Sequence, residues 1–549
     1  MTTFRKFMVA ATVTTALAAA PAAASAAPGG DGNNNTVRKI TQAMTAEGVL
    51  EHERELQAIA DRNGGTRVSG SNGYDESADY AEQVFRDAGL EVTRQDFTFN
   101  TFITTSPTVF RQVAPAPTRD LAANIMSYSG SGTTPSALAT LPNLTPTGSL
   151  ALGCLPTDFG PANAGTIVLV SRGACTFAAK ATNAAAAGAA GVVIYNNAAG
   201  ELNGTLGATF TGDFSVIGIT QALGQELVGL VPSGLRLQLA TATFRGEATT
   251  SNVIAQTPGG NPDNVVMIGG HLDSVNAGPG INDNGSGAGS VLELAQVMAK
   301  TKTANAVRFA VWGAEESGLI GATRYVASLS QAEKDKLAMY LNFDMVASPN
   351  FVRFVYDGDD SVGDGNVGPA GSAQIEQAFT SYFASQGLAS DPTDFSGRSD
   401  YGPFIAAGIP SGGLFTGAEG VKTPAQARIY GGVAGAAYDP CYHQACDALR
   451  QDFTGDPAKA ALYRDLAARY PLVGNVNLLA QEQMGDAIAA VTLTFAISSS
   501  SVNDVAGAPG QRKGQLKPGG SGTGGTSGTS DGSGGGLHDE HDEHELVAS

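Results

Sequence analysis

The sequence predicts an α/β fold in which a mostly parallel central sheet carries helices on both faces. Two observations lead to this prediction. Between residues 249 and 500, short β-branched runs alternate with longer helix-like stretches, and such alternation builds parallel sheets. Before that region, residues 119–248 change in character, which predicts an inserted β-rich α/β domain. The expected strands of the main sheet are 264–268, 307–311 and 338–343, and the expected helices are 286–299 and 317–328.

Residues 37–118 are expected to complete the main domain. Apolar residues up to Leu56 and Ile59 recur at helical spacing, and a second helix with the same spacing ends at Gly89, where a strand begins. His52 lies on the first of these helices among charged residues, and we therefore expect it at the surface.

The inserted stretch, residues 119–248, is poor in charge and rich in Ala, Gly and Thr. It contains no His, and its few acidic residues are scattered, so we expect no catalytic site in it. An Ala-rich helix is expected at 177–190, and buried strands are expected at 167–170, 192–195, 216–219 and 235–239.

The first 26 residues predict a signal peptide. Arg5 and Lys6 precede an apolar run over residues 8–20, and a small-residue A-x-A cleavage site ends at Ala26. The alternative, a membrane anchor, needs a longer apolar run. No later stretch has the ~20 apolar residues of a spanning helix, so we expect a soluble, secreted protein, periplasmic if its source is a Gram-negative bacterium.

The other end of the chain, residues 506–549, is low in complexity. It is rich in Gly, Ser and Thr and then in His, Asp and Glu, from His538 to Glu545. Such a composition cannot bury enough surface to offset its ordering entropy, so we expect a disordered or removable tail. The terminal His/Asp/Glu cluster could gather divalent metal loosely, but a solvated tail is the favoured interpretation.

Composition excludes two classes of protein. Hydrophobic residues make up 42 % of the 549 and charged residues only 15 %, which is too apolar for an intrinsically disordered chain. The net charge of −19 argues against a nucleic-acid partner, since phosphate binding needs a basic face.

The four cysteines fall into two local pairs, 21 and 5 residues apart. In an exported protein this predicts two disulfides, Cys154–Cys175 and Cys441–Cys446. Free buried thiols are the alternative, and a cysteine zinc site is disfavoured because neither pair has C-x-x-C spacing.

Metal-capable side chains follow each strand of the predicted main sheet. The carboxyl ends of parallel strands meet at one edge, where ligands bind, so we expect these side chains to converge. The candidates are His271 and Asp273 after the first strand, Asp283 in the next loop, Glu315 and Glu316 after the second strand, Asp344 after the third, and His443 far downstream.

Two histidines stand out among the six. Three lie in the tail and one is His52, which leaves His271 and His443 in the region that looks catalytic. A lone His is more often structural than a metal ligand. Both of these sit in small-residue motifs among carboxylates, which favours the ligand interpretation.

This set of side chains fits two zinc ions. Imidazole and carboxylate are normal zinc ligands, and one His and one carboxylate per metal with a shared carboxylate make a symmetric site. A water shared by two zinc ions becomes a nucleophile near neutral pH. Side chains of adjacent Glu315 and Glu316 diverge, so one is expected to bind zinc and the other to act as general base; a solvated charged pair is the alternative. Asp273 suits a supporting role, accepting the other ring N–H of His271.

These motifs resemble the secreted co-catalytic di-zinc aminopeptidases of bacteria and fungi, the family that includes the leucine aminopeptidases. The resemblance covers residues 37–118 and 249–500, and it implies a zinc exopeptidase fold and a specific role for each motif. By this resemblance His271 and Asp344 bind one zinc, Glu316 and His443 bind the other, and Asp283 bridges the two. The resemblance also implies that Glu315 is the general base, that Tyr442 stabilises the oxyanion and that Arg398 lies near the substrate. The Cys441–Cys446 link would brace the loop that carries His443.

The inserted stretch resembles a protease-associated (PA) domain, on the strength of residues 165–173 and 186–195. A PA domain in this position resembles the aminopeptidase Y-like branch, where it is taken to cover the cleft or contact substrate; a purely structural lid is an equal alternative here.

The activity implied by the resemblance is removal of N-terminal residues, with an apolar preference, from peptides that have a free N-terminus, by a monomer that spans no membrane. The rivals are a zinc carboxypeptidase, a one-zinc glutaminyl cyclase and an inactive receptor-like binding protein. The full set of five ligands disfavours the last two.

Overall fold

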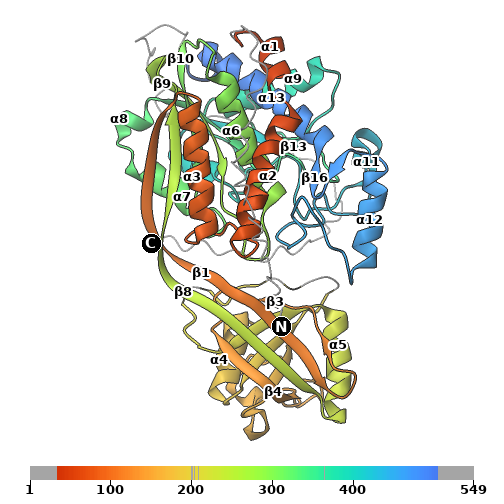
Figure 1. Cartoon of the computed structure of the whole chain (residues 1–549). Helices are drawn as coiled ribbons and strands as arrows, with labels where there is room; N and C mark the ends of the chain where they lie inside the picture. The colour runs from red at the N-terminus through yellow and green to blue at the C-terminus, as the bar shows by residue number, and fades with distance from the viewer. Residues whose placement is uncertain (1–33, 199–201, 203, 208, 364, 505–549) are drawn as a thin grey trace, which may run out of the picture. The chain divides into compact units, whose positions relative to one another are not determined.

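The computed structural model describes residues 34–504 except 199–201, 203, 208 and 364 (Figure 1). The predicted signal peptide and the predicted tail lie outside these residues. Within them, no helix is both long enough and apolar enough to cross a bilayer.

The main sheet is mostly parallel at its centre, as predicted. Strands β14, β11, β9 and β10 lie side by side and run parallel, while β12 pairs antiparallel with β14 and β8 pairs antiparallel with β10. The strands are β8 (Arg236–Gln256), β9 (Asn261–His271), β10 (Asn305–Trp312), β11 (Leu337–Phe343), β12 (Phe354–Tyr356), β13 (Asp391–Thr393) and β14 (Ser411–Phe415), with a separate hairpin of β15 (Leu472–Val473) and β16 (Val476–Asn477).

Helices cover both faces of this sheet, which confirms the predicted fold class. Successive residues of β9 point to opposite sides, so that Val266 and Ile268 join one buried cluster and Val265 and Met267 join another. The first cluster includes residues of α1 (Val37–Ala43), α2 (Ala46–Arg62), α3 (Asn72–Asp87), α6 (Gly287–Met298), α9 (Ser372–Ser385) and α13 (Leu478–Ile497). The second includes residues of α7 (Ile320–Ser328) and α10 (Tyr401–Ala406). The other α-helices described in the main part are α8 (Gln331–Lys334), α11 (Pro424–Tyr430), α12 (Pro457–Ala467) and α14 (Ser500–Asn503).

Two helices differ in extent from the prediction. The helix expected from Ser317 begins only at Ile320, because the preceding residue, Leu319, takes a left-handed conformation (φ 59°) and closes a turn after β10. The Ala-rich helix α4 (Phe177–Ala186) ends four residues before the expected residue 190, because Gly188 adopts a left-handed conformation (φ +79°).

The expectation that His52 is exposed is wrong. Its side chain is buried, at 4 % exposure; Nδ1 lies 2.7 Å from the Tyr80 hydroxyl and Nε2 lies 3.4 Å from a Glu293 carboxylate oxygen. The charged neighbours in sequence were misleading, because His52 lies on the same helix face as Val49 and Leu56.

The inserted stretch contributes a second group of parallel strands, which β4 and β8 join to the main sheet. Strands β5, β6 and β7 are parallel, and buried apolar clusters lie on both of their faces. Two long antiparallel strands, β1 (Glu91–Ala114) and β8, continue from the main sheet into this stretch (Figure 1). The other elements are β2 (Arg119–Asp120), β3 (Asn124–Ile125), β4 (Gly132–Thr140), β5 (Ile167–Ser171), β6 (Gly191–Tyr195), β7 (Ser215–Ile219), α4 and α5 (Gln221–Leu230).

Each part contains one disulfide. Cys154 is bonded to Cys175 in the inserted stretch, and Cys441 is bonded to Cys446 in the main part. The buried Lys180 ammonium donates hydrogen bonds to the carbonyls of Leu152 (2.6 Å) and Gly173 (2.8 Å), next to the first of these disulfides.

Candidate metal centre

The histidines and carboxylates that the sequence singles out meet at the carboxyl edge of the main sheet. His271 is the last residue of β9, Glu315 and Glu316 lie just after β10, and Asp344 directly follows β11. Asp283 comes from the loop before α6. His443 comes from a loop closed by the Cys441–Cys446 disulfide.

Short distances divide the ligand atoms into two groups. In the first, His271 Nε2 lies 3.2 Å from Asp283 Oδ1 and 3.4 Å from Asp344 Oδ1. In the second, His443 Nε2 lies 3.2 Å from Asp283 Oδ2 and 3.1 Å from Glu316 Oε2. Asp283 therefore offers one oxygen to each histidine and belongs to both groups.

These spacings fit a pair of tetrahedral metal ions. Ligand atoms about 2.0–2.1 Å from a tetrahedral zinc ion lie about 3.3–3.4 Å apart, close to the observed separations. Two buried oxygens in the groups, Glu316 Oε1 and Asp344 Oδ1, have no hydrogen-bond partner among the described residues. Buried carboxylates without donors are costly unless they are paired or bind a cation. Two imidazoles and three carboxylates form a donor set that zinc accepts.

The charges of the site shift the pKa values of its members strongly. Burial alone lowers the pKa of His271, but the carboxylates of Glu315 and Asp344 outweigh it and hold that pKa well above its usual value. Burial raises the pKa of Asp283, yet the hydrogen bonds with His271 and His443 prevail and lower it overall. The centre is therefore a buried, strongly anionic field that attracts cations.

Glu315 lies at the edge of the first group. Its Oε2 is 3.9 Å from His271 Nε2, which is longer than the 3.2 and 3.4 Å of Asp283 and Asp344. Ligand atoms of Glu315, His271 and Asp344 still fall within 4.8 Å of one another, so proximity alone does not exclude it as a ligand. Burial, followed by the charges of Glu316 and Asp400, raises the pKa of Glu315 well above its usual value.

Comparison with known proteins identifies the family. Residues 252–462 match peptidase family M28, and residues 146–227 match the PA domain. An aminopeptidase of Pseudomonas aeruginosa is 41 % identical over 86 % of this chain and 85 % of its own length. The leucine aminopeptidase 2 of Trichophyton rubrum is 47 % identical over 60 % of this chain and 66 % of its own length.

The chain belongs to peptidase family M28. A solved structure, an aminopeptidase from Aneurinibacillus sp. strain AM-1, superimposes with a TM-score of 0.54 at 26 % identity and covers 83 % of this chain and 95 % of that one. The predicted family and the predicted PA domain are both confirmed.

In this M28 peptidase, Asp273 lies beside His271, and both its main-chain carbonyl and its carboxylate face the imidazole. His271 Nδ1 is 3.1 Å from the main-chain carbonyl of Asp273 and 3.6 Å from its carboxylate. The carboxylate also accepts the backbone N–H of Glu315, at 3.2 Å. Asp273 thus links the imidazole of His271 to the segment after β10.

Tyr442 and Arg398 lie together at the rim of the M28 centre. The Tyr442 ring stacks on His443, with 3.9 Å between ring centroids. Arg398 donates one hydrogen bond to the Tyr442 hydroxyl (3.2 Å) and another to Glu419 (2.7 Å). Glu419 carried no signal in the sequence, because it lies 21 residues from its partner in a Gly-rich loop.

The structure also brings in residues that the sequence analysis missed. Ser399 donates a 2.7 Å hydrogen bond to Asp344 Oδ2, and neither carboxyl oxygen of the adjacent, fully buried Asp400 has a partner among the described residues. Arg67 is fully buried and donates to the carbonyls of Leu272, Pro279 and Gly280, which form the loop between His271 and Asp283. The only available signal was that Ser399 and Asp400 directly follow Arg398.

Proposed function

We propose that this M28 enzyme is a secreted aminopeptidase that removes N-terminal residues from peptides with the help of two zinc ions. The observation that carries the proposal is the position of Asp283, whose two oxygens each face a different histidine at 3.2 Å. One carboxylate between two His–carboxylate pairs is what a two-metal site requires. The names of the relatives, aminopeptidase and leucine aminopeptidase 2, support the activity and an apolar N-terminal residue.

Five side chains would hold the metal ions. His271 and Asp344 would bind one, Glu316 and His443 the other, and Asp283 both. When bound, two zinc ions supply Lewis acidity: they lower the pKa of a shared water and polarise the scissile carbonyl.

Glu315 is the proposed general base. It is 8 % exposed, and its Oε2 lies 3.9 Å from His271 Nε2, farther than the oxygens of Asp283 and Asp344, so it borders the ligand groups without being needed in either of them. It would take the proton of the attacking water and return it to the amine nitrogen of the leaving group.

Tyr442 is proposed to donate a hydrogen bond to the substrate carbonyl oxygen as negative charge develops there. Its hydroxyl oxygen already accepts a hydrogen bond from Arg398, which leaves the hydroxyl proton free for the substrate. Arg398 would thus orient Tyr442 and lie beside the bound peptide.

The proposed domain limits are those expected from the sequence. We propose that residues 37–118 and 249–500 form the peptidase domain, that 119–248 form the PA domain, and that the enzyme is a monomer. The two family matches lie inside these limits. Two disulfides support export to an oxidising compartment.

The test is hydrolysis of leucine p-nitroanilide by the purified chain. We expect activity that a zinc chelator removes and added zinc restores, with about two zinc ions per chain at full activity. N-acetyl-leucine p-nitroanilide is the matched control and should not be cleaved. Cleavage of the acetylated substrate, or release of C-terminal residues from peptides, would contradict the aminopeptidase assignment; no hydrolysis at any zinc concentration would favour a binding protein.

A further inference from the structure

The loop that carries His443 runs from Asp439 to Asp447, and both of these end residues contact the loop that carries Asp283. At one end, the carboxylate of Asp447 accepts two successive backbone N–H groups, from Asn282 (2.8 Å to Oδ1) and from Asp283 itself (3.0 Å to Oδ2). Asp447 is 2 % exposed. The peptide group that precedes the Asp283 side chain is therefore held by a buried carboxylate four residues beyond His443.

At the other end of the loop, Asp439 contacts the same segment. Its Oδ2 accepts a 2.7 Å hydrogen bond from the Asn282 side chain, and its Oδ1 accepts the backbone N–H of Cys441 at 2.8 Å. Asn282 also uses its side-chain oxygen to accept the N–H of Ala347, which lies three residues after Asp344.

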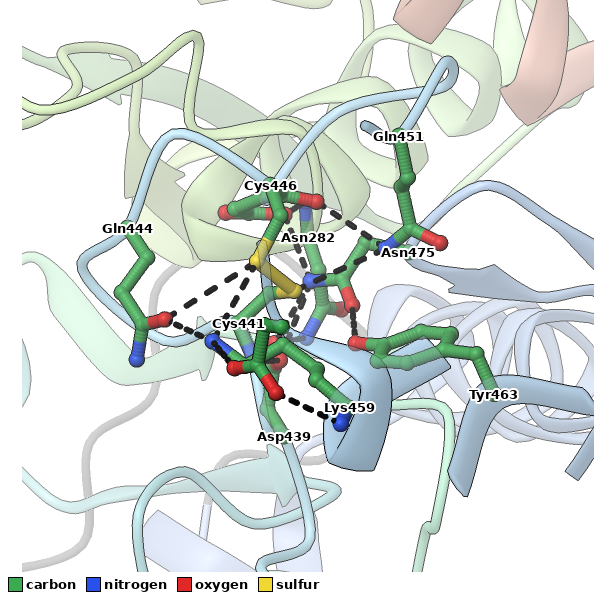
Figure 2. Close-up of a disulfide and its surroundings, with 11 residues drawn as sticks. Asn282, Asp439, Cys441, Gln444, Cys446, Gln451, Lys459, Tyr463 and Asn475 are labelled. Carbon is green, nitrogen blue, oxygen red and sulfur yellow. Dashed lines mark hydrogen bonds and ion pairs between the residues drawn. A yellow bond between two sulfur atoms is a disulfide. The ribbon is translucent and has the colours of Figure 1, made fainter. Parts of the chain in front are cut away.

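Asn475 joins these two carboxyl groups into one buried hub. Its amide nitrogen lies 2.9 and 3.0 Å from the two oxygens of Asp439 and 2.8 Å from Asp447 Oδ1, and its side-chain oxygen accepts the Tyr463 hydroxyl. Figure 2 shows Asn475 between Asn282, Asp439 and Tyr463, next to the Cys441–Cys446 disulfide. Asn475 is fully buried.

We propose that Asp447, held by Asn475, is a positioning residue that sets the bridging carboxylate of Asp283 relative to His443. The inference rests on the proposed two-zinc function. A ligand that serves two metals must satisfy both geometries at once, so its backbone has to be fixed more tightly than that of a ligand to one metal. The hub meets this need by joining the backbone N–H of the bridge and both ends of the His443 loop.

The test measures the zinc affinity of the full-length chain by competition with a chromogenic chelator, at a temperature where every variant is folded. Asp447→Asn keeps the shape of the side chain but turns one acceptor toward the N–H groups into a donor. We expect the dissociation constant of the weaker-bound zinc to rise about 10- to 100-fold, as for other partners that orient metal ligands. Excess zinc should restore part of the activity on leucine p-nitroanilide.

A matched pair of buried amides separates positioning from stability. Asn475→Ala removes the hub, whereas Asn305→Ala removes an equally buried amide at the opposite end of β10, where it donates to the Phe495 carbonyl at 2.8 Å. Both variants should lower the unfolding temperature of the metal-free chain, but only Asn475→Ala should weaken zinc binding.

Four outcomes would each overturn one of the two proposals. Unchanged zinc affinity in Asp447→Asn and Asn475→Ala, or an equal loss in Asn305→Ala, overturns the positioning role. If the first two variants do not fold, Tyr463→Phe removes a single hydroxyl bond to Asn475 and should give a smaller rise in the dissociation constant; no rise overturns the role as well. A wild-type chain that binds no zinc overturns the proposed function instead.

Discussion

The peptidase part and the PA part of this chain both contain neighbouring parallel strands with buried apolar faces, yet different residues follow these strands. In the peptidase part, β9 ends in His271 and the segments after β10 and β11 bring Glu315, Glu316 and Asp344. In the PA part, β5, β6 and β7 are followed by Arg172, Asn196 and Thr220.

The difference shows that a parallel sheet supplies only the meeting place. Strands with the same direction bring their carboxyl ends to one edge in both parts. A metal centre arises only where the residues at that edge can bind metal and where a further loop adds a bridging carboxylate. The PA part has no histidine in its sequence, so its edge cannot copy the centre.

We expect the largest effect when a substitution at the carboxyl edge of the peptidase strands is compared with one at the carboxyl edge of the PA strands. Asp283→Ala removes the bridge from both proposed metals, and we expect metal content to fall and activity on leucine p-nitroanilide to drop about 10⁴-fold or more, since metal catalysis is worth several kcal/mol. Elemental analysis and initial rates measure both. Asn196→Ala, after β6 of the PA part, is the control and should keep full metal content and activity. Equal losses in both variants would mean that the comparison is wrong.

The second prediction tests whether Glu315 is the general base or a zinc ligand. Glu315→Gln should keep both zinc ions and lower turnover about 10²- to 10⁴-fold, because the amide cannot accept the proton of the attacking water. Glu53→Gln is the matched control: Glu53 is also a buried glutamate whose pKa is raised by burial, but it lies on α2 and belongs to neither group of ligand atoms. Loss of zinc from Glu315→Gln would make Glu315 a ligand instead.

The sequence could predict those site residues whose type can bind metal and whose position directly follows an apolar strand. His271, Asp344 and the Glu315-Glu316 pair each follow an apolar strand, and that position is readable without a structure. The residues that hold them in place were not readable. Asp447 contacts Asn282 across 165 positions, and Arg67 contacts Leu272 across 205, in both cases through backbone atoms that leave no mark on the partner's side chain.

The elements themselves were predictable for a related reason. Strand and helix periods are local, so the strands around 264–268, 307–311 and 338–343 appear where expected. Burial of a single polar residue is not local. His52 is buried because Tyr80 and Glu293, on two other helices, provide partners for both of its ring nitrogens.

The third prediction compares the two disulfides. Cross-links over 21 and 5 residues restrain the unfolded chain by about 3 and about 2 kcal/mol in the loop-entropy model, so the PA bridge should matter more for stability. Replacing Cys154 and Cys175 by Ser should lower the unfolding midpoint and leave turnover of a small substrate unchanged. Replacing Cys441 and Cys446 should lower turnover and zinc affinity, and should lower the free energy of unfolding by less than the replacement of Cys154 and Cys175. Denaturant unfolding and zinc titration of both double variants, at 25 °C, give the comparison.

The reverse pattern would be informative as well. If the Cys154/Cys175 variant lost turnover while folded, the PA part would contribute to catalysis on small substrates. If the Cys441/Cys446 variant kept wild-type zinc affinity, the His443 loop would be fixed by Asp439 and Asp447 alone.

The smallest expected effect concerns a buried acid that the PA part lacks among its described residues. Glu53 is fully buried, accepts a 2.9 Å hydrogen bond from Gln481 on Oε1, and has no partner for Oε2; Gln481 Oε1 also has no described partner. Burial, then the charge of Asp447, raises the pKa of Glu53 well above its usual value. A proton on Oε2 would turn this unpaired acceptor into a donor and would remove the cost of burying a charge.

This raised pKa makes stability depend on pH with a defined sign. The folded chain keeps the proton that the unfolded chain releases above its ordinary pKa of 4.5, so the contribution of Glu53 to stability is greatest below that pH and declines as pH rises toward the folded pKa. Glu53→Gln supplies a permanent N–H donor, and its stability relative to wild type should grow by up to about 1.4 kcal/mol per pH unit over that range. Urea unfolding at pH 5.5 and 7.5 measures the difference, and Glu51→Gln, an exposed residue on the same helix, should show none. A constant difference between the two pH values would mean that Glu53 is ionised in the folded chain, and the two orphan oxygens would then need another explanation.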